Sequence, residues 1–85
     1  MRKITVYTRQ LCGFCTRATS LLYEAGYAFE EIAADGDPAL RAELVKRSGQ
    51  STLPQVFVGE KSVGGYRELA IALSEGSFAQ LLDAN

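Results

Sequence analysis

Both cysteines of the chain lie in one short segment, TRQLCGFCTRA, where Gly13 and Phe14 separate Cys12 from Cys15. Such a pair can ligate zinc or an iron–sulfur cluster, form a structural disulfide, or exchange disulfides as a redox pair. A zinc site within one chain needs a tetrahedral ligand set, and the sequence has no second cysteine pair and no histidine. A disulfide across so short a loop removes little chain entropy, and a cluster needs ligands from elsewhere. The sequence therefore favours a redox pair.

The position of Cys12 suits a nucleophile. The β-branched and aromatic run at 4–8 predicts a strand, and apolar spacing predicts a helix after the cysteines. Unpaired N–H groups and the positive end of the helix dipole converge at such a helix start, and Arg9 and Arg17 add positive charge. We expect these to stabilise a thiolate and to lower the pKa of Cys12 below its ordinary value of about 8.5. Cys15, one turn further on, could then resolve the mixed disulfide that Cys12 forms.

The rest of the chain predicts strands that alternate with helices. Three helices are indicated by apolar stripes, and Gly26, Gly49 and Gly76 are typical helix ends. Asp37 followed by Pro38 predicts the start of the second helix. The predicted strands are 4–8, 27–33, 55–58 and a short one around Val63. The residues predicted to face the core are Phe14, Ala18, Leu21, Leu22 and Ala25 on the first helix, Leu40, Leu44 and Val45 on the second, and Tyr66, Leu69, Ala70 and Leu73 on the third.

A short last helix is predicted after Ser77, which could cap it, with Phe78, Leu81 and Leu82 as its apolar residues. The element order is then βαβαββα with this short C-terminal helix. Alternation at the start implies parallel strands, and the closing hairpin supplies an antiparallel edge. The sequence predicts an α/β domain, 1–85, with a four-stranded mixed sheet flanked by helices.

Three motifs on this pattern, CGFC at 12–15, TLP at 52–54 and GG at 64–65, give the chain a resemblance to a family. Over essentially its whole length it resembles a glutaredoxin of the thioredoxin-like fold. The resemblance implies a glutathione-dependent thiol–disulfide oxidoreductase that reduces protein–glutathione mixed disulfides and protein disulfides. It also implies a cis Leu53–Pro54 bond beside Cys12, where glutathione could pair as an added strand.

The resemblance also implies roles for single residues. Cys12 would take the glutathionyl group, and Arg9 and Arg41 would hold the glycine carboxylate of glutathione, although Arg41 could equally be solvated on an exposed helix face. The N–H groups of Tyr66 and Arg67 would meet the γ-glutamyl carboxylate. Glutathione contacts are thus implied for Arg9, Phe14, Arg41, Leu53, Pro54, Gly65, Tyr66, Arg67 and Glu68, with Glu68 meeting the amino group.

The active-site segment departs from the family's commonest pattern, which has Pro-Tyr between the cysteines. Gly13 in place of proline resembles members that hold a [2Fe–2S] cluster between two chains, ligated by the first cysteine of each chain and two glutathiones. In that alternative Cys12 is a metal ligand; otherwise no metal is expected. A further alternative is a redoxin reduced by thioredoxin reductase, since GGYRE at 64–68 slightly resembles that group, whereas RSGQSTLPQVFV looks much more like glutaredoxin.

The overall composition narrows the class of partner. A net charge of −1 and a pI near 5.3 argue against nucleic acid, because phosphate binding needs a concentrated basic face. No signal peptide or membrane span is expected, and two cysteines are too few for a disulfide-stapled secreted domain. We therefore expect a cytoplasmic protein, monomeric unless a cluster bridges two chains, whose partners are glutathione and glutathionylated or disulfide-containing proteins.

Overall fold

The four strands form a single sheet in the order β2-β1-β3-β4. In this computed structural model, which describes residues 2–84, β1 (Ile4–Thr8) pairs in parallel with β2 (Glu30–Ala33). On its other side β1 pairs antiparallel with β3 (Gln55–Val58), and β3 forms a hairpin with β4 (Lys61–Gly64). The predicted mixed sheet, with a parallel first pair and an antiparallel edge, is confirmed.

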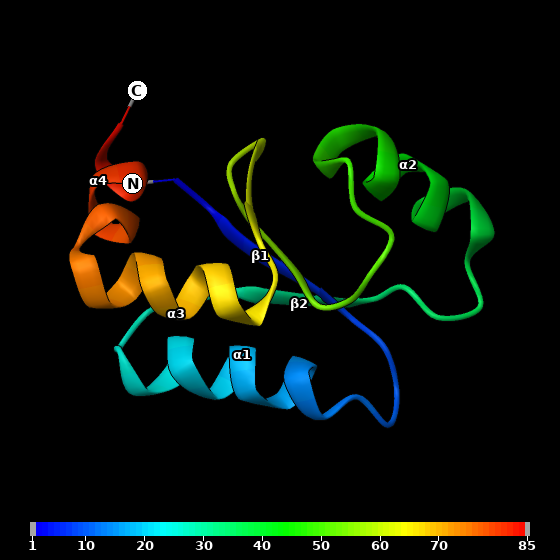
Figure 1. Cartoon of the computed structure of the whole chain (residues 1–85), viewed down its shortest axis with the longest axis horizontal. Helices are drawn as coiled ribbons and strands as arrows, with labels where there is room; N and C mark the ends of the chain where they lie inside the picture. Colours follow the sequence, from blue (N-terminus) through cyan, green and yellow to red (C-terminus); the bar gives the residue numbers. More distant parts are fainter. Residues whose placement is uncertain (1, 85) are drawn as a thin grey trace.

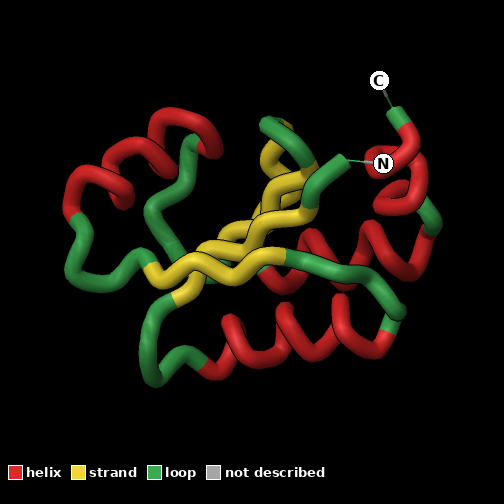
Figure 2. Tube along the Cα trace, turned by 180° about the vertical axis from the view of Figure 1, so that it is seen from behind, coloured by secondary structure: helices red, strands yellow, loops and turns green. Residues whose placement is uncertain are grey.

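Helices cover both faces of the sheet, as Figures 1 and 2 show. On one face α1 (Gly13–Glu24) and α3 (Tyr66–Glu75) lie side by side, and α4 (Ser77–Asp83) continues from α3. The opposite face carries α2 (Pro38–Ser48) alone. The predicted order βαβαββα with a short final helix is therefore confirmed. Among residues 2–84, no helix has the length and apolar character needed to cross a membrane.

Successive side chains along the central strands point to opposite faces of the sheet, so the core is divided into two clusters, one on each face. Val6 and Val56, which are partners in the ladder, point toward α1 and α3, whereas Tyr7 and Phe57 point toward α2. The larger cluster comprises Ile4, Val6, Ala18, Leu22, Val56, Val58, Leu69, Ala72, Phe78 and Leu82, and the smaller one comprises Tyr7, Ala34, Leu44 and Phe57.

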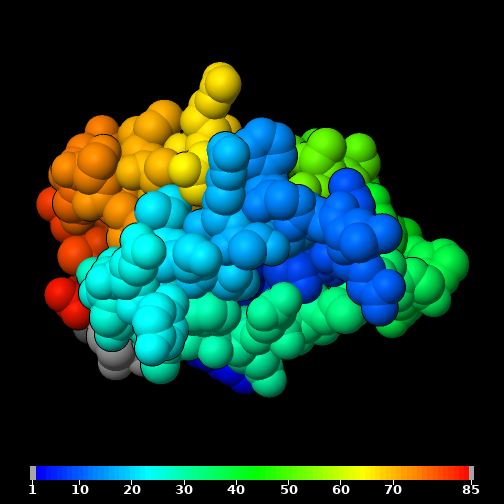
Figure 3. All heavy atoms as spheres, turned by 90° about the horizontal axis from the view of Figure 1, so that it is seen from below, coloured from blue at the N-terminus to red at the C-terminus, as the bar shows by residue number. Residues whose placement is uncertain are grey.

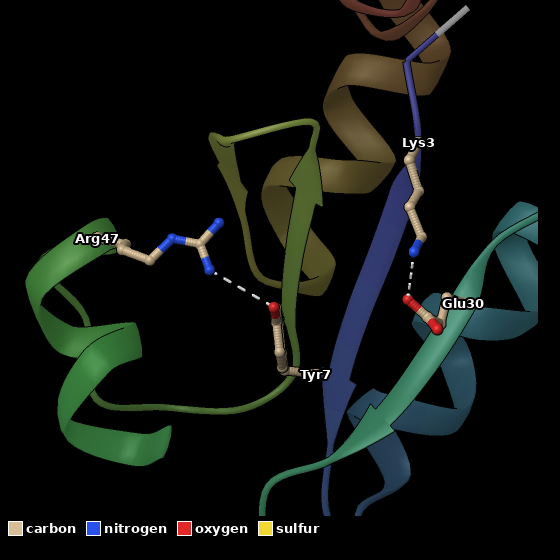
Figure 4. Close-up of polar contacts among 4 residues, drawn as sticks. All are labelled: Lys3, Tyr7, Glu30 and Arg47. Carbon is tan, nitrogen blue, oxygen red and sulfur yellow. Dashed lines mark hydrogen bonds and ion pairs between the residues drawn. The ribbon is translucent and has the colours of Figure 1, made fainter. Parts of the chain in front are cut away.

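A cation from α2 completes the smaller cluster. The guanidinium carbon of Arg47 lies 4.3 Å from the centre of the Phe57 ring, and Nη1 donates to the hydroxyl of Tyr7 at 3.5 Å. Figure 4 shows the hydrogen bond between Arg47 and Tyr7, and a separate ion pair between Lys3 and Glu30, whose atoms lie 2.8 Å apart. A hydrogen bond and the charge of Glu30 raise the pKa of Lys3 above its ordinary value. Arg47 thus attaches the C-terminal turn of α2 to the sheet.

The predicted helix boundaries agree closely with the structure. Asp37 is the N-cap of α2, and its carboxylate accepts the N–H of Leu40 at 3.1 Å. Gly49 and Gly76 adopt the left-handed conformation at the ends of α2 and α3, which glycine does without steric cost. Ser77 is not the cap of α4, because Gly76 occupies the N-cap position and Ser77 is the first helical residue.

Three predicted inward-facing residues are exposed. Phe14 and Val45 are 58% and 42% exposed, and Ala25 is also exposed. Phe14 lies in the first turn of α1 and Ala25 is its C-cap residue, so both flank the buried positions of the helix, which run from Cys15 to Leu22. Val45 lies beside Leu44 on α2, and a short helix over so small a cluster buries only one narrow stripe.

The second strand is shorter than the predicted 27–33. The structure has no strand at 27–29, because the N–H of Tyr27 donates to the carbonyl of Leu22 and closes the end of α1. Tyr27 and Phe29 pack against the larger core cluster instead. Aromatic residues that favour a strand locally are here used to cover the core between α1 and β2.

Candidate active site

Cys12 is the N-cap of α1, and it forms a disulfide with Cys15. The backbone of Cys12 is extended, its Sγ accepts the N–H of Cys15 at 3.1 Å, and its carbonyl accepts the N–H of Thr16. The sulfur atom therefore stands in the positive field of the helix start, where negative charge is stabilised. A thiolate formed at Cys12 by reduction would keep this same N–H donor.

The loop before Cys12 is held from two sides. Nη1 of Arg9 donates to the carbonyls of Gln10 and Leu11 at 3.1 and 3.2 Å. The N–H of Gln10 donates to the carboxylate of Asp35, in the turn that follows β2, at 3.0 Å. Leu11 adopts a positive φ of 53° and is 99% exposed. The loop is thus built by polar contacts and leaves an apolar side chain in solvent directly beside the disulfide.

The segment before β3 approaches the disulfide from the opposite side. The Leu53–Pro54 bond is cis, as the family resemblance implied. The carbonyl oxygen of Leu53 lies 3.9 Å from Sγ of Cys12, although 41 residues separate them in the chain. Both cysteines are nearly buried, at 8% exposure for Cys12 and 4% for Cys15. Cys12 is the less buried of the two, and its sulfur lies against the backbone of Leu53.

A groove of about 500 Å³ runs beside this site. In Figure 3 the segment that carries the cysteines (light blue) lies next to the yellow start of α3 and the yellow-green segment before β3. These three segments bring together residues that are distant in sequence. The groove is lined by Phe14, Thr52, Leu53, Pro54, Gly65, Tyr66, Arg67, Glu68, Ala70 and Ile71.

One wall of the groove is aromatic. The rings of Phe14 and Tyr66 stack with their centroids 5.8 Å apart and their planes at 30°. The guanidinium carbon of Arg17 lies 5.5 Å from the centre of the Phe14 ring. The ring of Phe14, which is absent from the core, thus links the active-site helix to the first turn of α3.

The start of α3 forms the other end of the groove. Gly65 is the N-cap, and its N–H donates to Oε1 of Glu68 at 2.8 Å, so this carboxylate already has a backbone partner. A side chain at Gly64 would meet Glu68, because an added Cβ would lie 2.8 Å from its Cβ and Cγ. The glycine motif therefore allows the carboxylate of Glu68 to fold back over the helix start.

The predicted glutathione contacts are only partly brought together. Phe14, Leu53, Pro54 and the residues 65–68 line one groove, but Arg9 and Arg41 do not line it. Nη2 of Arg41 donates to the carbonyl of Ser51 at 2.9 Å, so this side chain is neither simply solvated nor directed into the groove.

Three residues that the family resemblance did not give as glutathione contacts also line the groove. Thr52 belongs to the TLP motif and Ala70 was predicted to face inward, whereas Ile71 carried no signal in the sequence; the packing of α3 against the loop before β3 places all three there. Leu11 could have been singled out, because an apolar residue directly before a redox cysteine has no place in the core pattern. Among residues 2–84 no cluster of three or more His, Cys, Asp or Glu side chains could hold a metal ion.

The fold and the paired cysteines at a helix start define a thiol–disulfide oxidoreductase of the thioredoxin-like class. The family model for glutaredoxin matches residues 4–63. A glutaredoxin of Pseudomonas aeruginosa is 43% identical over 84 residues, which cover 99% of this chain and all of the relative. Glutaredoxin 3 of Escherichia coli K12 is 38% identical over 82 residues, which cover 96% of this chain and 99% of the relative. The chain belongs to the glutaredoxin family.

Solved structures agree with this assignment. The solution structure of a glutaredoxin from Brucella melitensis has a TM-score of 0.84 and 44% identity, and the match covers 96% of this chain and 89% of that one. A crystal structure of a buckwheat glutaredoxin–glutathione complex has a TM-score of 0.85 and 28% identity, with coverage of 95% and 76%. The chain is therefore similar along its length to glutaredoxins from bacteria and plants.

Proposed function

We propose that this protein uses glutathione to reduce protein–glutathione mixed disulfides and protein disulfides, with Cys12 as nucleophile and Cys15 as resolving thiol. The observation that carries the proposal is the position of Cys12. It is the N-cap of α1, it accepts an N–H, and it faces the backbone of Leu53 beside an open groove. A nucleophilic thiolate needs such an electropositive setting, and Cys12, at 8% exposure against 4% for Cys15, is the less buried of the two cysteines.

With a glutathionylated protein, the Cys12 thiolate attacks the sulfur of the glutathionyl group. A bond forms between Cys12 and glutathione while the bond to the substrate protein breaks, and the released thiolate takes a proton from solvent. A second glutathione thiolate then attacks the same glutathionyl sulfur, which yields glutathione disulfide and returns the Cys12 thiolate. One free glutathione is thus consumed for each protein thiol released, the two halves of the glutathione disulfide coming from the substrate and from that glutathione, and Cys15 is not needed for this route.

With a protein disulfide, Cys12 attacks one sulfur and forms a mixed disulfide, which Cys15 then attacks at the Cys12 sulfur. The substrate leaves as a dithiol and the two cysteines remain as a disulfide, which is the state of this structure. Glutathione would return this disulfide to the dithiol form. The short separation of the two cysteines makes the second attack intramolecular.

Glutathione is proposed to lie in the groove as an extended peptide. The backbone of Leu53 would pair with its cysteine unit, and the N–H groups of Tyr66 and Arg67 at the start of α3 would meet the γ-glutamyl carboxylate. The complex of the buckwheat relative with glutathione supports this ligand. Glu68 keeps one carboxylate oxygen free of its bond to Gly65 and could meet the amino group.

The roles proposed for Arg9 and Arg41 require part of each guanidinium group. One nitrogen of Arg9 holds two backbone carbonyls and one nitrogen of Arg41 holds a third, and each guanidinium group retains further N–H donors. We propose that these remaining donors attract the glycine carboxylate of glutathione from outside the groove, which neither arginine lines. We also propose a cytoplasmic location, because the proposed catalytic cycle needs a reducing pool of glutathione.

The decisive experiment measures turnover of a glutathione mixed disulfide in the presence of glutathione, with wild-type protein and the Cys12→Ser and Cys15→Ser variants. We expect Cys12→Ser to abolish turnover and Cys15→Ser to retain it. With a protein disulfide as substrate, both variants should fail. Complete loss of mixed-disulfide turnover in Cys15→Ser would contradict the assigned roles. Wild-type protein that fails with glutathione would contradict the dependence on glutathione.

The cluster-carrier alternative depends on Gly13. A Cβ added at this position would meet nothing within 4 Å, so the helix start beside Cys12 is sterically open. In this alternative Cys12 of each of two chains and two glutathiones would hold the [2Fe–2S] cluster as cargo. Anaerobic reconstitution with iron, sulfide and glutathione tests it: a coloured dimer supports the alternative, and a colourless monomer contradicts it.

Reduction by thioredoxin reductase is the remaining alternative. It differs from the proposed function only in the electron donor, so the same oxidised protein distinguishes them. We expect glutathione to reduce the Cys12–Cys15 disulfide, and thioredoxin reductase with its nicotinamide donor to do so much more slowly. The opposite order of rates would favour the alternative.

A further inference from the structure

The segment between α2 and β3 is held by side-chain donors instead of a backbone ladder. Nε2 of Gln55 donates to the carbonyls of Gln50 and Thr52 at 2.8 and 3.1 Å. The carbonyl of Ser51 between them accepts Nη2 of Arg41 at 2.9 Å. The carbonyl of Gln50 also accepts the hydroxyl of Ser48 at 3.2 Å, but Gln55 and Arg41 are the side chains that together reach all three successive carbonyls. We call this arrangement, Gln55 and Arg41 on the carbonyls of 50–52, the loop clamp.

Gln55 is the buried member of the loop clamp. It is the first residue of β3, it stands opposite Tyr7 in the ladder, and only 1% of it is exposed. Both of its partners are carbonyl oxygens, which can only accept, so its amide nitrogen must face them. Its Oε1 atom is buried without a hydrogen-bond partner among residues 2–84.

A buried amide with an unpaired oxygen lowers stability, whereas an apolar residue of similar size would fill the same space without this cost. A glutamine at this position is therefore not explained by core packing. What it supplies, and an apolar residue could not, is the pair of N–H donors that fix the loop. The function of this polar residue must follow from where the loop stands.

The loop leads directly to the site. Leu53 and Pro54 separate the clamped carbonyls from Gln55, and the carbonyl of Leu53 lies 3.9 Å from Sγ of Cys12. We propose that Gln55 is a positioning residue for thiol–disulfide exchange: it holds the loop so that the backbone of Leu53 is ready to pair with an extended peptide whose cysteine reacts with Cys12. This inference rests on the proposed function for its chemistry but not on glutathione itself.

Two disulfide substrates distinguish a positioning role of Gln55 from a general structural role. Pre-reduced protein is mixed with increasing concentrations of either a disulfide-linked tripeptide dimer with central cysteines or bis(2-hydroxyethyl) disulfide. In a single turnover the Cys12 and Cys15 thiols give up two electrons and form their disulfide, while the substrate leaves as two thiols, so no other reductant is needed. The tripeptide can pair with Leu53, whereas the hydroxyethyl compound has no peptide group.

In the Gln55→Met variant, the half-saturating concentration of the tripeptide disulfide should rise about tenfold, because a flexible loop must be ordered on binding and two neutral hydrogen bonds are lost. The maximal rate should change less than about twofold, since Cys12 keeps its own N–H donor from Cys15. The rate with the hydroxyethyl disulfide should stay unchanged. Gln80→Met, on the exposed surface of α4, is the matched control and should leave both substrates unaffected.

A second variant covers the case in which Gln55→Met fails to fold. Gln55→Asn keeps the amide but is shorter by one methylene, so it cannot reach both carbonyls, and a smaller rise with the tripeptide alone is expected. An equal effect of the foldable variant on both disulfides, or no effect on either, would overturn the positioning role.

Wild-type results distinguish this inference from the proposed function. If wild-type protein reduces the tripeptide disulfide but not a glutathione mixed disulfide, glutathione dependence is wrong and the role of Gln55 is still decided by its variants. If wild-type protein reduces neither the tripeptide disulfide nor the glutathione one, both ideas are refuted.

Discussion

Arg47 and Phe57 offer a quantitative test of how α2 is attached to the sheet. The Phe57 ring is fully buried, the guanidinium carbon of Arg47 lies 4.3 Å from its centre, and the Tyr7 ring meets it edge-on with centroids 5.6 Å apart. We consider Arg47→Met, which keeps an apolar chain over the ring, together with Phe57→Leu and the double variant. This contact fixes the end of α2, from which the chain runs into the loop clamp.

The magnitudes follow from the environment of each group. A half-buried cation over an aromatic ring is worth about 1 kcal/mol, between the exposed and desolvated limits. Arg47→Met should therefore lower the free energy of unfolding by about 1 kcal/mol beyond the loss of charge at the helix end. Phe57→Leu also loses the edge-on pair and some volume, so it should cost about 3 kcal/mol. The double variant should show a coupling energy of about 1 kcal/mol, because the cation–ring contact is lost only once.

Urea unfolding of the four proteins, with both cysteines in the disulfide, measures this coupling energy. Lys46→Met is the matched control: it removes an exposed cation from the same last turn of α2, whereas Arg47 is the cation that lies over the Phe57 ring. Its cost should stay below about 0.5 kcal/mol. A coupling energy below about 0.3 kcal/mol would refute the reasoning, since independent substitutions add to within that margin.

Further predictions concern the start of α3, the start of α2 and the sheet edge. Gly64→Ala should lower the free energy of unfolding by about 2 kcal/mol in thermal or urea unfolding, because φ is 121° and the new Cβ would meet Glu68; an unchanged stability would contradict the crowding seen there. Asp37→Ala should cost about 1 kcal/mol through loss of the N-cap, and Asp37→Asn should restore most of it. Lys3 has a pKa raised by Glu30, so its ion pair stabilises the fold below the unfolded-state pKa of lysine and this contribution is lost as pH rises through the folded-state pKa. The difference in Tm between Lys3→Gln and wild-type protein should therefore be small, should shrink in high salt, and should vanish at strongly alkaline pH; a difference that grows there would be incompatible with this linkage.

Local sequence determined the elements and the reactive pair. The caps at Asp37, Gly49 and Gly76 act within a few residues of themselves, so their patterns could be interpreted without the fold. The same holds for Cys12 at the start of a helix, because the N–H donors that it needs belong to the next turn. The family resemblance then supplied the cis bond before Pro54, which no composition or period indicates.

Only the tertiary structure decided which residues meet. The stack of Phe14 on Tyr66, the cation of Arg47 over Phe57 and the amide of Gln55 on the loop all join segments whose contact depends on strand order and on which face each side chain takes. Hydrophobic periodicity reports that a side chain is apolar, not what it will touch, and so it placed Phe14 in the core when its ring in fact borders the groove. The two cysteines alone therefore indicate the chemistry of this protein. The groove beside them exists only after the sheet has brought residues 12–14, 52–54 and 65–68 together.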